Sequence, residues 1–249
     1  MTRIATLSDT RNNCHNCRLR SLCLPDNLSK DDLGELDSIV QRRKPVARGA
    51  YLFQAGERFQ SIFAVRTGAV KTLTVQANGD EHISGFHLPG EVIGLDAIVS
   101  RDHPSTAIAL ESTSVCEIPY AELESLGDRM PAVQHQLVRV MSRELLAEHH
   151  TGHLLTRRAA EQRLAVVLLA FSERFARRGL SALRFRLPMS RLDLGNYLGL
   201  VPETMSRTFR RLEEQGLVSI TGKEIELVDI CAMKALAYGN NEGGLAAKA

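Results

Sequence analysis

DLGNYLGLVPETMSR occupies residues 193–207 and decides the fold of the second half of the chain. Arg191 to Leu198 reads as a short helix, Pro202 to Gln215 reads as a second one, and Gly199 suits the turn between them. Gly195 permits the two helices to cross closely. Apolar residues of both helices would pack the pair together: Leu194, Leu198, Leu200, Met205 and Leu212. The stretch predicts a helix–turn–helix.

The second helix has an unusual start, and a hairpin follows it. Val201 stands at the N-cap position, where Ser or Thr is common, while Pro202 at the first helical position supplies a suitable φ angle. Residues 217–220 and 225–228 are apolar, β-prone runs that flank the turn residues 221–224. We expect a winged helix–turn–helix.

Polar residues of this second helix are candidates for DNA contact. Glu203 and Arg207 are four residues apart, which fits either a surface ion pair or readout of bases, Glu to cytosine and Arg to guanine. Ser206 lies on the same side. Arg210 and Arg211 are phosphate contacts or solvated charges. Within a helix–turn–helix we favour base readout for Glu203, Ser206 and Arg207.

The overall composition does not indicate DNA binding, so any contact with DNA must come from local basic clusters. The chain has 249 residues, 44% hydrophobic and 24% charged, with a net charge of +2, which is enough for one large domain or two modest ones. This balance is too mild to imply nucleic-acid binding by itself. Basic clusters do stand out at residues 174–178 and 207–211. Residues 1–13 lack an apolar signal core and no apolar run would cross a bilayer, so we expect a cytoplasmic protein without a membrane partner.

Cysteines gather at the start of the chain. Cys14, Cys17 and Cys23 form a C-x2-C-x5-C pattern, and Cys116 lies in a strand-like segment. Four thiolates can hold an iron–sulfur cluster or a structural zinc, and the spacing alone does not choose between them. In a reducing compartment a disulfide is disfavoured. Cys231, in an apolar helical run, is expected to be a small core residue.

The first half of the chain alternates between helical and β-prone patterns. Residues 31–40 follow helical spacing. From residue 49 to about 119, glycines separate short β-prone runs, and Asn78-Gly79 is typical of a tight hairpin turn. This pattern of short β-prone runs separated by glycines predicts an antiparallel barrel or roll.

A long helix is expected from residue 132 to about 155. Residues on one side step by three and four, as in a coiled coil: Val138, Met141, Leu145, Glu148, Gly152 and Leu155. A second apolar face holds Leu137, Val140 and Leu146. Because one face can pack on the roll, we interpret the other as the seam of a homodimer.

These patterns together predict an α+β chain with an N-terminal antiparallel β-roll, a long dimerisation helix and a C-terminal winged helix–turn–helix. The expected divisions are a cysteine-bearing arm, a roll, the long helix, the winged helix–turn–helix and a disordered tail: residues 1–30, 31–131, 132–157, 158–238 and 239–249.

The arrangement resembles the cyclic-AMP-receptor-like superfamily of transcription regulators. The cysteine spacing, GDEHISGFHL at residues 79–88 and DLGNYLGL at residues 193–200 resemble its oxygen-sensing FNR branch, over about residues 14–228. The resemblance implies a non-enzymatic regulator with a 4Fe–4S cluster on Cys14, Cys17, Cys23 and Cys116, whose destruction by oxygen weakens the dimer.

The resemblance also implies partners. Double-stranded DNA would carry an inverted repeat of TTGAT-like half-sites, read by the second helix, and RNA polymerase would be contacted near Gly79 and Arg178. Residues 90–94 resemble the start of a phosphate-binding cassette, but Pro104 stands where that cassette has an arginine, so no cyclic nucleotide is expected. The rival interpretations are a small-molecule-gated regulator of the same fold and a zinc-stabilised DNA-binding protein without a sensing role.

Overall fold

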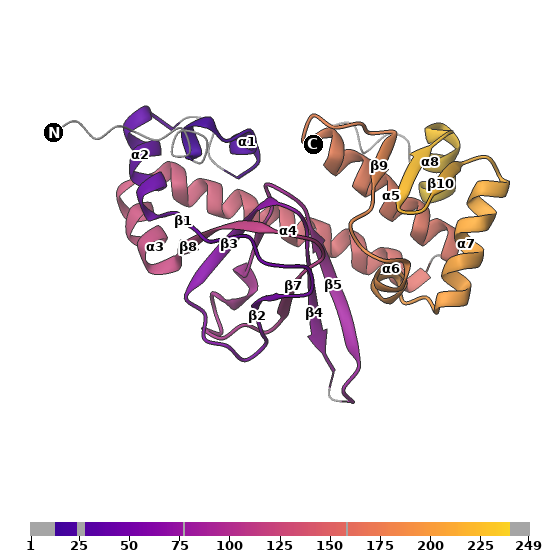
Figure 1. The fold of residues 1–249 in the computed structure, drawn as a ribbon, viewed down its shortest axis with the longest axis horizontal. Helices are drawn as coiled ribbons and strands as arrows, with labels where there is room; N and C mark the ends of the chain where they lie inside the picture. Colours follow the sequence, from indigo (N-terminus) through magenta and orange to yellow (C-terminus); the bar gives the residue numbers. More distant parts are fainter. Residues whose placement is uncertain (1–12, 24–27, 77, 158, 240–249) are drawn as a thin grey trace. The chain divides into compact units, whose positions relative to one another are not determined.

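The computed structural model of the chain describes residues 13–23, 28–76, 78–157 and 159–239, and for residues 147–157 it describes the backbone alone (Figure 1). The chain divides into two compact units, Met1–Leu146 and Ala147–Ala249. No helix within the described ranges is long and apolar enough to cross a membrane.

Two four-stranded antiparallel sheets form the first unit, with strand orders β1-β8-β3-β6 and β2-β7-β4-β5. The strands are β1 (Gln41–Arg42), β2 (Tyr51–Phe53), β3 (Ser61–Thr67), β4 (Val70–Val75), β5 (Glu81–His87), β6 (Val92–Ile93), β7 (Thr106–Ala109) and β8 (Ser114–Pro119), and the 3-10 turn η2 (Leu95–Ala97) follows β6. Buried side chains from both sheets share one core: Phe53, Phe63, Val65, Val70, Ile93, Ala107 and Val115. The sheets therefore pack face to face, and the expected antiparallel roll is confirmed.

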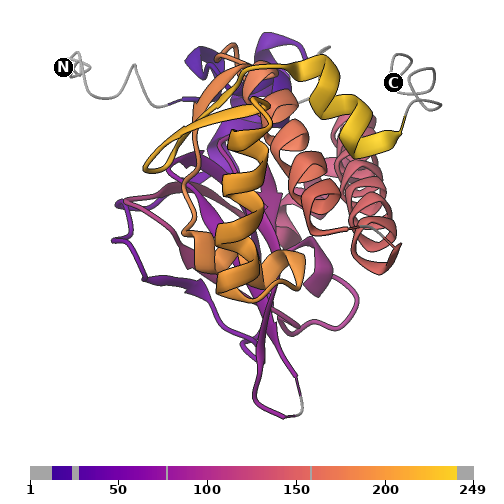
Figure 2. The same ribbon diagram turned by 90° about the vertical axis from the view of Figure 1, so that its right-hand side faces the viewer.

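The β4–β5 hairpin extends beyond the rest of the roll (Figure 2). Gly79 lies in its turn with φ of +87°, and the side chain of Asn78 accepts a hydrogen bond from the backbone N–H of Asp80 at 3.0 Å. The predicted Asn-Gly turn is confirmed.

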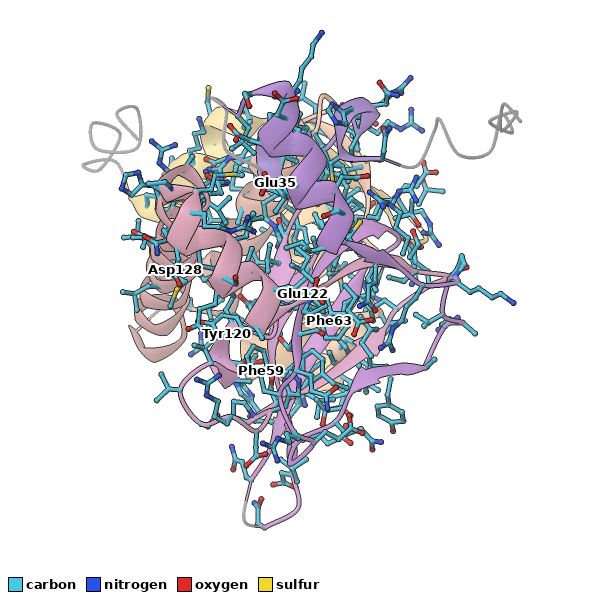
Figure 3. The ribbon with its side chains drawn as sticks, turned by 90° about the vertical axis from the view of Figure 1, so that its left-hand side faces the viewer. Glu35, Phe59, Phe63, Tyr120, Glu122 and Asp128 are labelled. Atoms are coloured by element: carbon cyan, nitrogen blue, oxygen red, sulfur yellow. The ribbon has the colours of Figure 1, made fainter. Side chains whose placement is uncertain are left out.

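Short helices join the roll: η1 (Cys14–Asn16), α1 (Arg20–Cys23), α2 (Lys30–Ile39) and α3 (Tyr120–Arg129). Ser29 caps α2 by accepting from the backbone N–H of Asp32, and Leu33 and Leu36 supply its buried face. Figure 3 shows Glu35 on α2, Asp128 on α3, and Tyr120 at the start of α3 beside Phe59. The rings of Tyr120 and Phe59 lie 5.3 Å apart, centroid to centroid, which ties the start of α3 to the roll.

Helix α4 (Pro131–Arg157) is the predicted long helix. Val133 and Val140 are buried and Leu137 is half-buried, so this face packs on the first unit. The assignment of Leu146 to the same face is wrong, because its side chain is 58% exposed. Leu146 is six residues beyond Val140, and at 3.6 residues per turn that places it well away from the buried stripe.

Within its described residues the second unit contains the end of α4, four further helices and a three-stranded sheet of order β10-β11-β9. Its elements are α5 (Ala160–Ala176), β9 (Arg184–Arg186), α6 (Arg191–Leu198), α7 (Pro202–Glu214), β10 (Val218–Thr221), β11 (Glu224–Leu227) and α8 (Ile230–Tyr238). The antiparallel β10–β11 pair turns at Gly222 and Lys223. The predicted helix–turn–helix and wing are confirmed.

Two glycines shape the α6–α7 turn. Gly199 caps α6 in the left-handed conformation, with φ of +64°. A Cβ atom added to Gly195 would lie 2.9 Å from the carbonyl oxygen of Leu200, and the Leu200 N–H donates to the Gly195 carbonyl at 2.8 Å. The close approach requires glycine at position 195.

Cys231 corrects another expectation. It was assigned to the core, but it is exposed. The buried residues of α8 are Met233 and Ala237, four residues apart. Cys231 precedes Met233 by two positions, which turns it about 200° away from that face.

Candidate thiol site and nucleic-acid interface

Two of the three N-terminal cysteines lie in short helical turns, and Cys17 follows the first turn as its C-cap. Cys14 begins η1, whose N-cap Asn13 accepts from the backbone N–H of Asn16, and Cys23 ends α1. Cys14 is buried, while Cys17 and Cys23 are partly exposed. The chain therefore bends tightly enough to bring thiols nine residues apart toward one region.

Cys116 lies in the middle of β8, paired with Arg42 of β1 on one side and Ala64 of β3 on the other. Cys14 belongs to the apolar core beneath the arm, and Cys23 and Cys116 pack against that core. The same core holds residues from α2, α3 and α4, which include Leu33, Leu36, Leu123, Leu126, Val133 and Val140. The structure therefore places Cys14, Cys23 and Cys116 at one apolar core.

Burial dominates the acid–base behaviour of these thiols. Desolvation, and then the nearby Asp37, raise the pKa of Cys14 to about 12. Desolvation, followed by the charges of Cys17 and Cys116, raises the pKa of Cys23 to about 12. Burial also raises the pKa of Cys116; the charges of Arg42 and Arg66 oppose this rise, and the charge of Cys17 adds to it. The four sulfurs lie close enough to influence one another, and a cation would have to displace their protons.

Four converging thiols are a donor set suited to soft metals and iron–sulfur clusters. Among the described residues, however, no three His, Cys, Asp or Glu side chains already stand in metal-binding geometry. The donor chemistry fits the predicted group, and the thiols would have to move closer to one another to hold it.

Asp37 and Arg42 surround Cys14 and were not predicted from the sequence. The backbone N–H of Cys14 donates to Asp37 Oδ1 at 2.7 Å, and Asp37 forms an ion pair with Arg42. Burial by itself would raise the pKa of Asp37, but hydrogen bonds from Cys14 and Arg42 outweigh it, so the pKa lies below its usual value. Cys14 and Asp37 are 23 positions apart, and no local pattern in the sequence signals the contact.

The polar residues of α7 lie opposite its buried face. Met205, Thr208, Phe209 and Leu212 are buried, whereas Glu203, Ser206, Arg207 and Arg210 are exposed. Glu203 and Arg207, both described, form no ion pair with each other. Val201 makes no side-chain cap and Pro202 opens the helix, as predicted. This face of α7 is exposed and polar, and is therefore accessible to a partner outside the chain.

Arg211 differs from Arg210 because it has an intramolecular partner. Its guanidinium Nη1 lies 3.0 Å from Glu161 Oε1 at the start of α5. The side chain of Arg211 is 64% exposed, so the pair is open to water and to a phosphate.

The predicted seam is described over its first half. Val138, Met141 and Leu145 on α4 are 63%, 42% and 60% exposed. The side chains of Glu148, Gly152 and Leu155 lie outside the described residues. The residues predicted to contact polymerase lie in different units, Gly79 in the β4–β5 turn and the half-buried Arg178 after α5.

The roll interior contains a histidine that the sequence did not single out. His103 is 4% exposed, its ring stacks on Phe53 at 3.8 Å between centroids, and its Nδ1 has no hydrogen-bond partner among the described residues. Pro104 is exposed. The Arg101 guanidinium lies 5.9 Å from the centroid of the Tyr120 ring.

An antiparallel roll, a long helix and a winged helix–turn–helix with an exposed polar face define a DNA-binding regulator with an attached sensor-type domain. Two family models match: the cyclic nucleotide-binding domain over residues 43–129 and the Crp-like helix-turn-helix domain over residues 162–236.

Similar proteins extend over most of the chain. The transcriptional activator protein Anr of Pseudomonas aeruginosa is 46% identical over 230 residues, 92% of this chain and 94% of the relative. The fumarate and nitrate reduction regulatory protein of Escherichia coli K12 is 43% identical over 224 residues, 90% of each chain. The structure of FixK2 from Bradyrhizobium japonicum matches with a TM-score of 0.73 and 30% identity, over 80% of this chain and 97% of that one. This chain belongs to the CRP/FNR superfamily, in its FNR-type branch, and is a transcription regulator rather than an enzyme.

Proposed function

We propose that this protein is a cytoplasmic, oxygen-responsive transcription regulator in which a 4Fe–4S cluster controls dimerisation and DNA binding. Cys14, Cys17, Cys23 and Cys116 would hold the cluster. When bound, the cluster supplies an inorganic centre that oxygen destroys.

The continuity of one apolar core carries this proposal. Cys14 belongs to that core, and so do Val133 and Val140 on the first half of α4. Cys23 and Cys116 pack against it. Because packed cores transmit small displacements rather than absorb them, drawing the thiols together shifts the helix that shares their core.

The opposite face of α4 provides the dimer seam. Val138 and Leu145 are more than half exposed in the single chain, and apolar residues at heptad-like spacing are suited to pack against a second copy. A two-fold dimer would place two α7 helices on successive major grooves of an inverted repeat with TTGAT-like half-sites. Glu203, Ser206 and Arg207 would read bases, and Arg210 and Arg211 would contact phosphates.

Two further parts of the proposal rest on the family. The β4–β5 turn at Gly79 and the region of Arg178 would contact RNA polymerase. The roll would not bind a cyclic nucleotide. Pro104 stands where the phosphate-binding cassette has its arginine, and the nearby Arg101 lies over the ring of Tyr120. A phosphate monoanion would have no guanidinium partner there.

Anaerobic purification tests the proposal most directly. The parent protein is expected to contain iron and acid-labile sulfide, with a brown absorbance that bleaches in air. Cys14→Ala, Cys17→Ala, Cys23→Ala and Cys116→Ala are each expected to lose iron and sulfide, and the exposed Cys231 provides the matched control, Cys231→Ala. Full loading of Cys116→Ala would contradict the four-thiol assignment.

The same preparation separates the rival functions. A colourless protein with stoichiometric zinc and air-insensitive DNA binding would favour the zinc-stabilised regulator. A metal-free protein whose DNA binding responds to an added nucleotide would favour a small-molecule-gated regulator.

A further inference from the structure

Asp37 contacts both the backbone of Cys14 and the neighbouring side chain of Arg42. It lies near the end of α2, where its Oδ1 accepts the Cys14 N–H at 2.7 Å and also pairs with Arg42. Asp37 therefore fixes the first turn of the cysteine arm and the side chain of Arg42 with one carboxylate.

Arg42 points its guanidinium at the thiols. Its Nη2 lies 3.7 Å from Cys14 Sγ, within the range of a hydrogen bond to sulfur. In the β1–β8 ladder Arg42 stands directly opposite Cys116. One positive group therefore lies next to two of the expected cluster ligands, which come from segments far apart in the sequence.

One donor of Arg42 remains unused. Its Nε is buried and has no hydrogen-bond partner among the described residues, although buried N–H groups are normally paired. Thiolate and inorganic sulfide are acceptors that carry negative charge, and hydrogen bonds to sulfur and local charge are known to tune iron–sulfur clusters.

We propose that Arg42 donates N–H hydrogen bonds to the sulfur of the bound cluster and offsets its negative charge, with Asp37 as the residue that positions Arg42 and Cys14. The inference rests on the proposed cluster function. An Arg at this position suits the task because its planar fork offers several donors in fixed directions.

Iron retention and the vibrational spectrum of the anaerobic protein test the inference. Arg42→Gln is expected to release iron to a ferrous chelator about tenfold faster than the parent protein, as loss of a charge-assisted hydrogen bond implies. Its iron–sulfur stretching bands in resonance Raman are expected to shift. Arg42→Lys keeps the positive charge but lacks the planar guanidinium, so its rate of iron release should lie between those of the parent protein and Arg42→Gln. Asp37→Asn keeps an acceptor for the Cys14 N–H but loses the charge, and should change the release rate in the same direction as Arg42→Gln.

Arg129→Gln is the matched control. Arg129 pairs with Glu35 on the same helix as Asp37, at 3.4 Å and with both side chains mostly exposed. This variant should retain iron as the parent does.

The outcomes separate this inference from the proposed function. A parent protein that binds no iron and sulfide overturns both. A loaded parent whose Arg42→Gln variant releases iron at the parental rate with unshifted bands overturns the inference alone. If Arg42→Gln does not fold, as judged by circular dichroism of the cluster-free protein, Arg42→Lys and Asp37→Asn decide, and parental behaviour of both overturns the inference.

Discussion

Arg211 on α7 forms an ion pair with Glu161 on α5, with 3.0 Å between Nη1 and Oε1. The carboxylate partly neutralises an arginine that would otherwise be fully available to a DNA phosphate. Arg211→Ala is expected to weaken binding to all sequences alike and to lower the salt dependence. Glu161→Gln should act in the opposite direction, with tighter binding to all sequences and a steeper salt slope. Titrations at several salt concentrations measure both effects, and an Arg211→Ala variant that discriminates between operators would contradict the phosphate role.

Arg207 and Glu203 should behave differently from Arg211. Each is exposed on the polar face of α7, so Arg207→Ala or Glu203→Ala is expected to lose about 1–3 kcal/mol of discrimination at one base pair of each half-site. Single-base operator variants measure this loss. Unchanged relative affinities across the operator set would exclude a base-reading role for the residue tested.

Gly195 is expected to be the least replaceable residue of the helix–turn–helix. An alanine Cβ there would lie 2.9 Å from the Leu200 carbonyl oxygen, and relieving that overlap should cost about 1–3 kcal/mol of unfolding free energy. The control is Gly34→Ala on α2, where nothing lies within 4 Å of the added Cβ. That change should stabilise by about 0.5–1 kcal/mol. Chemical denaturation gives both values, and equal stability of the two variants would show that the close crossing is not restrictive.

The stability of the roll is expected to depend on pH through the buried His103. Burial holds the pKa of His103 below its ordinary value of 6.5, although the carboxylates of Asp96, Glu57 and Asp102 oppose this. As the pH falls below about 6.5, the His103 imidazole becomes protonated in the unfolded chain while it is still neutral in the folded one. The free energy of unfolding therefore decreases as the pH falls from about 6.5 through the lowered pKa of the folded protein. His103→Phe, which can keep the stack on Phe53, should flatten this acid limb relative to its own stability at pH 8. Parallel stability curves for parent and variant between pH 8 and 5 would rule out His103 as the cause.

Glu148 remains a prediction from the sequence, because its side chain lies outside the described residues. At a two-fold seam it would approach its own copy or Glu144, and the repulsion between carboxylates would oppose dimerisation of the cluster-free protein. Glu148→Ala is therefore expected to form dimers and bind DNA in air without a cluster. Arg139→Ala, an exposed change away from the seam, is the control. Sedimentation of aerobic, iron-free protein measures the result, and a Glu148→Ala monomer like the parent would end this hypothesis.

The predictable features of the fold are those encoded by neighbouring residues. The α6–α7 turn, its caps and the wing depend on residues a few positions apart, such as Gly195 and Leu200, so the local pattern is sufficient. The errors at Leu146 and Cys231 have another cause. Both lie in short apolar runs where only the packing of the whole unit decides which side of a helix is covered.

The thiol site likewise combines features that the local sequence indicates with features that depend on the packing of the whole unit. The residue types and spacing indicate Cys14, Cys17 and Cys23 as candidate ligands, and the resemblance to the FNR branch implies Cys116 as the fourth. The Asp37–Arg42 pair joins residues only five positions apart, but its place beside Cys14 has no local signature, because it depends on contacts over 23 and 28 positions between α2, β1 and the arm. Likewise, the stack of His103 on Phe53 joins residues of a loop and of β2 that sequence periodicity does not connect.

The shared core beneath the arm has a consequence for genetics. Met130 and Val133 bind nothing in the proposed mechanism, yet both are buried in the same core as Cys14. A change of volume at either position would alter oxygen response and self-association together. Mutant screens for an altered air response should therefore recover buried residues around the start of α4 as readily as the cysteines, and the phenotype alone would not distinguish a damaged sensor from a damaged dimer.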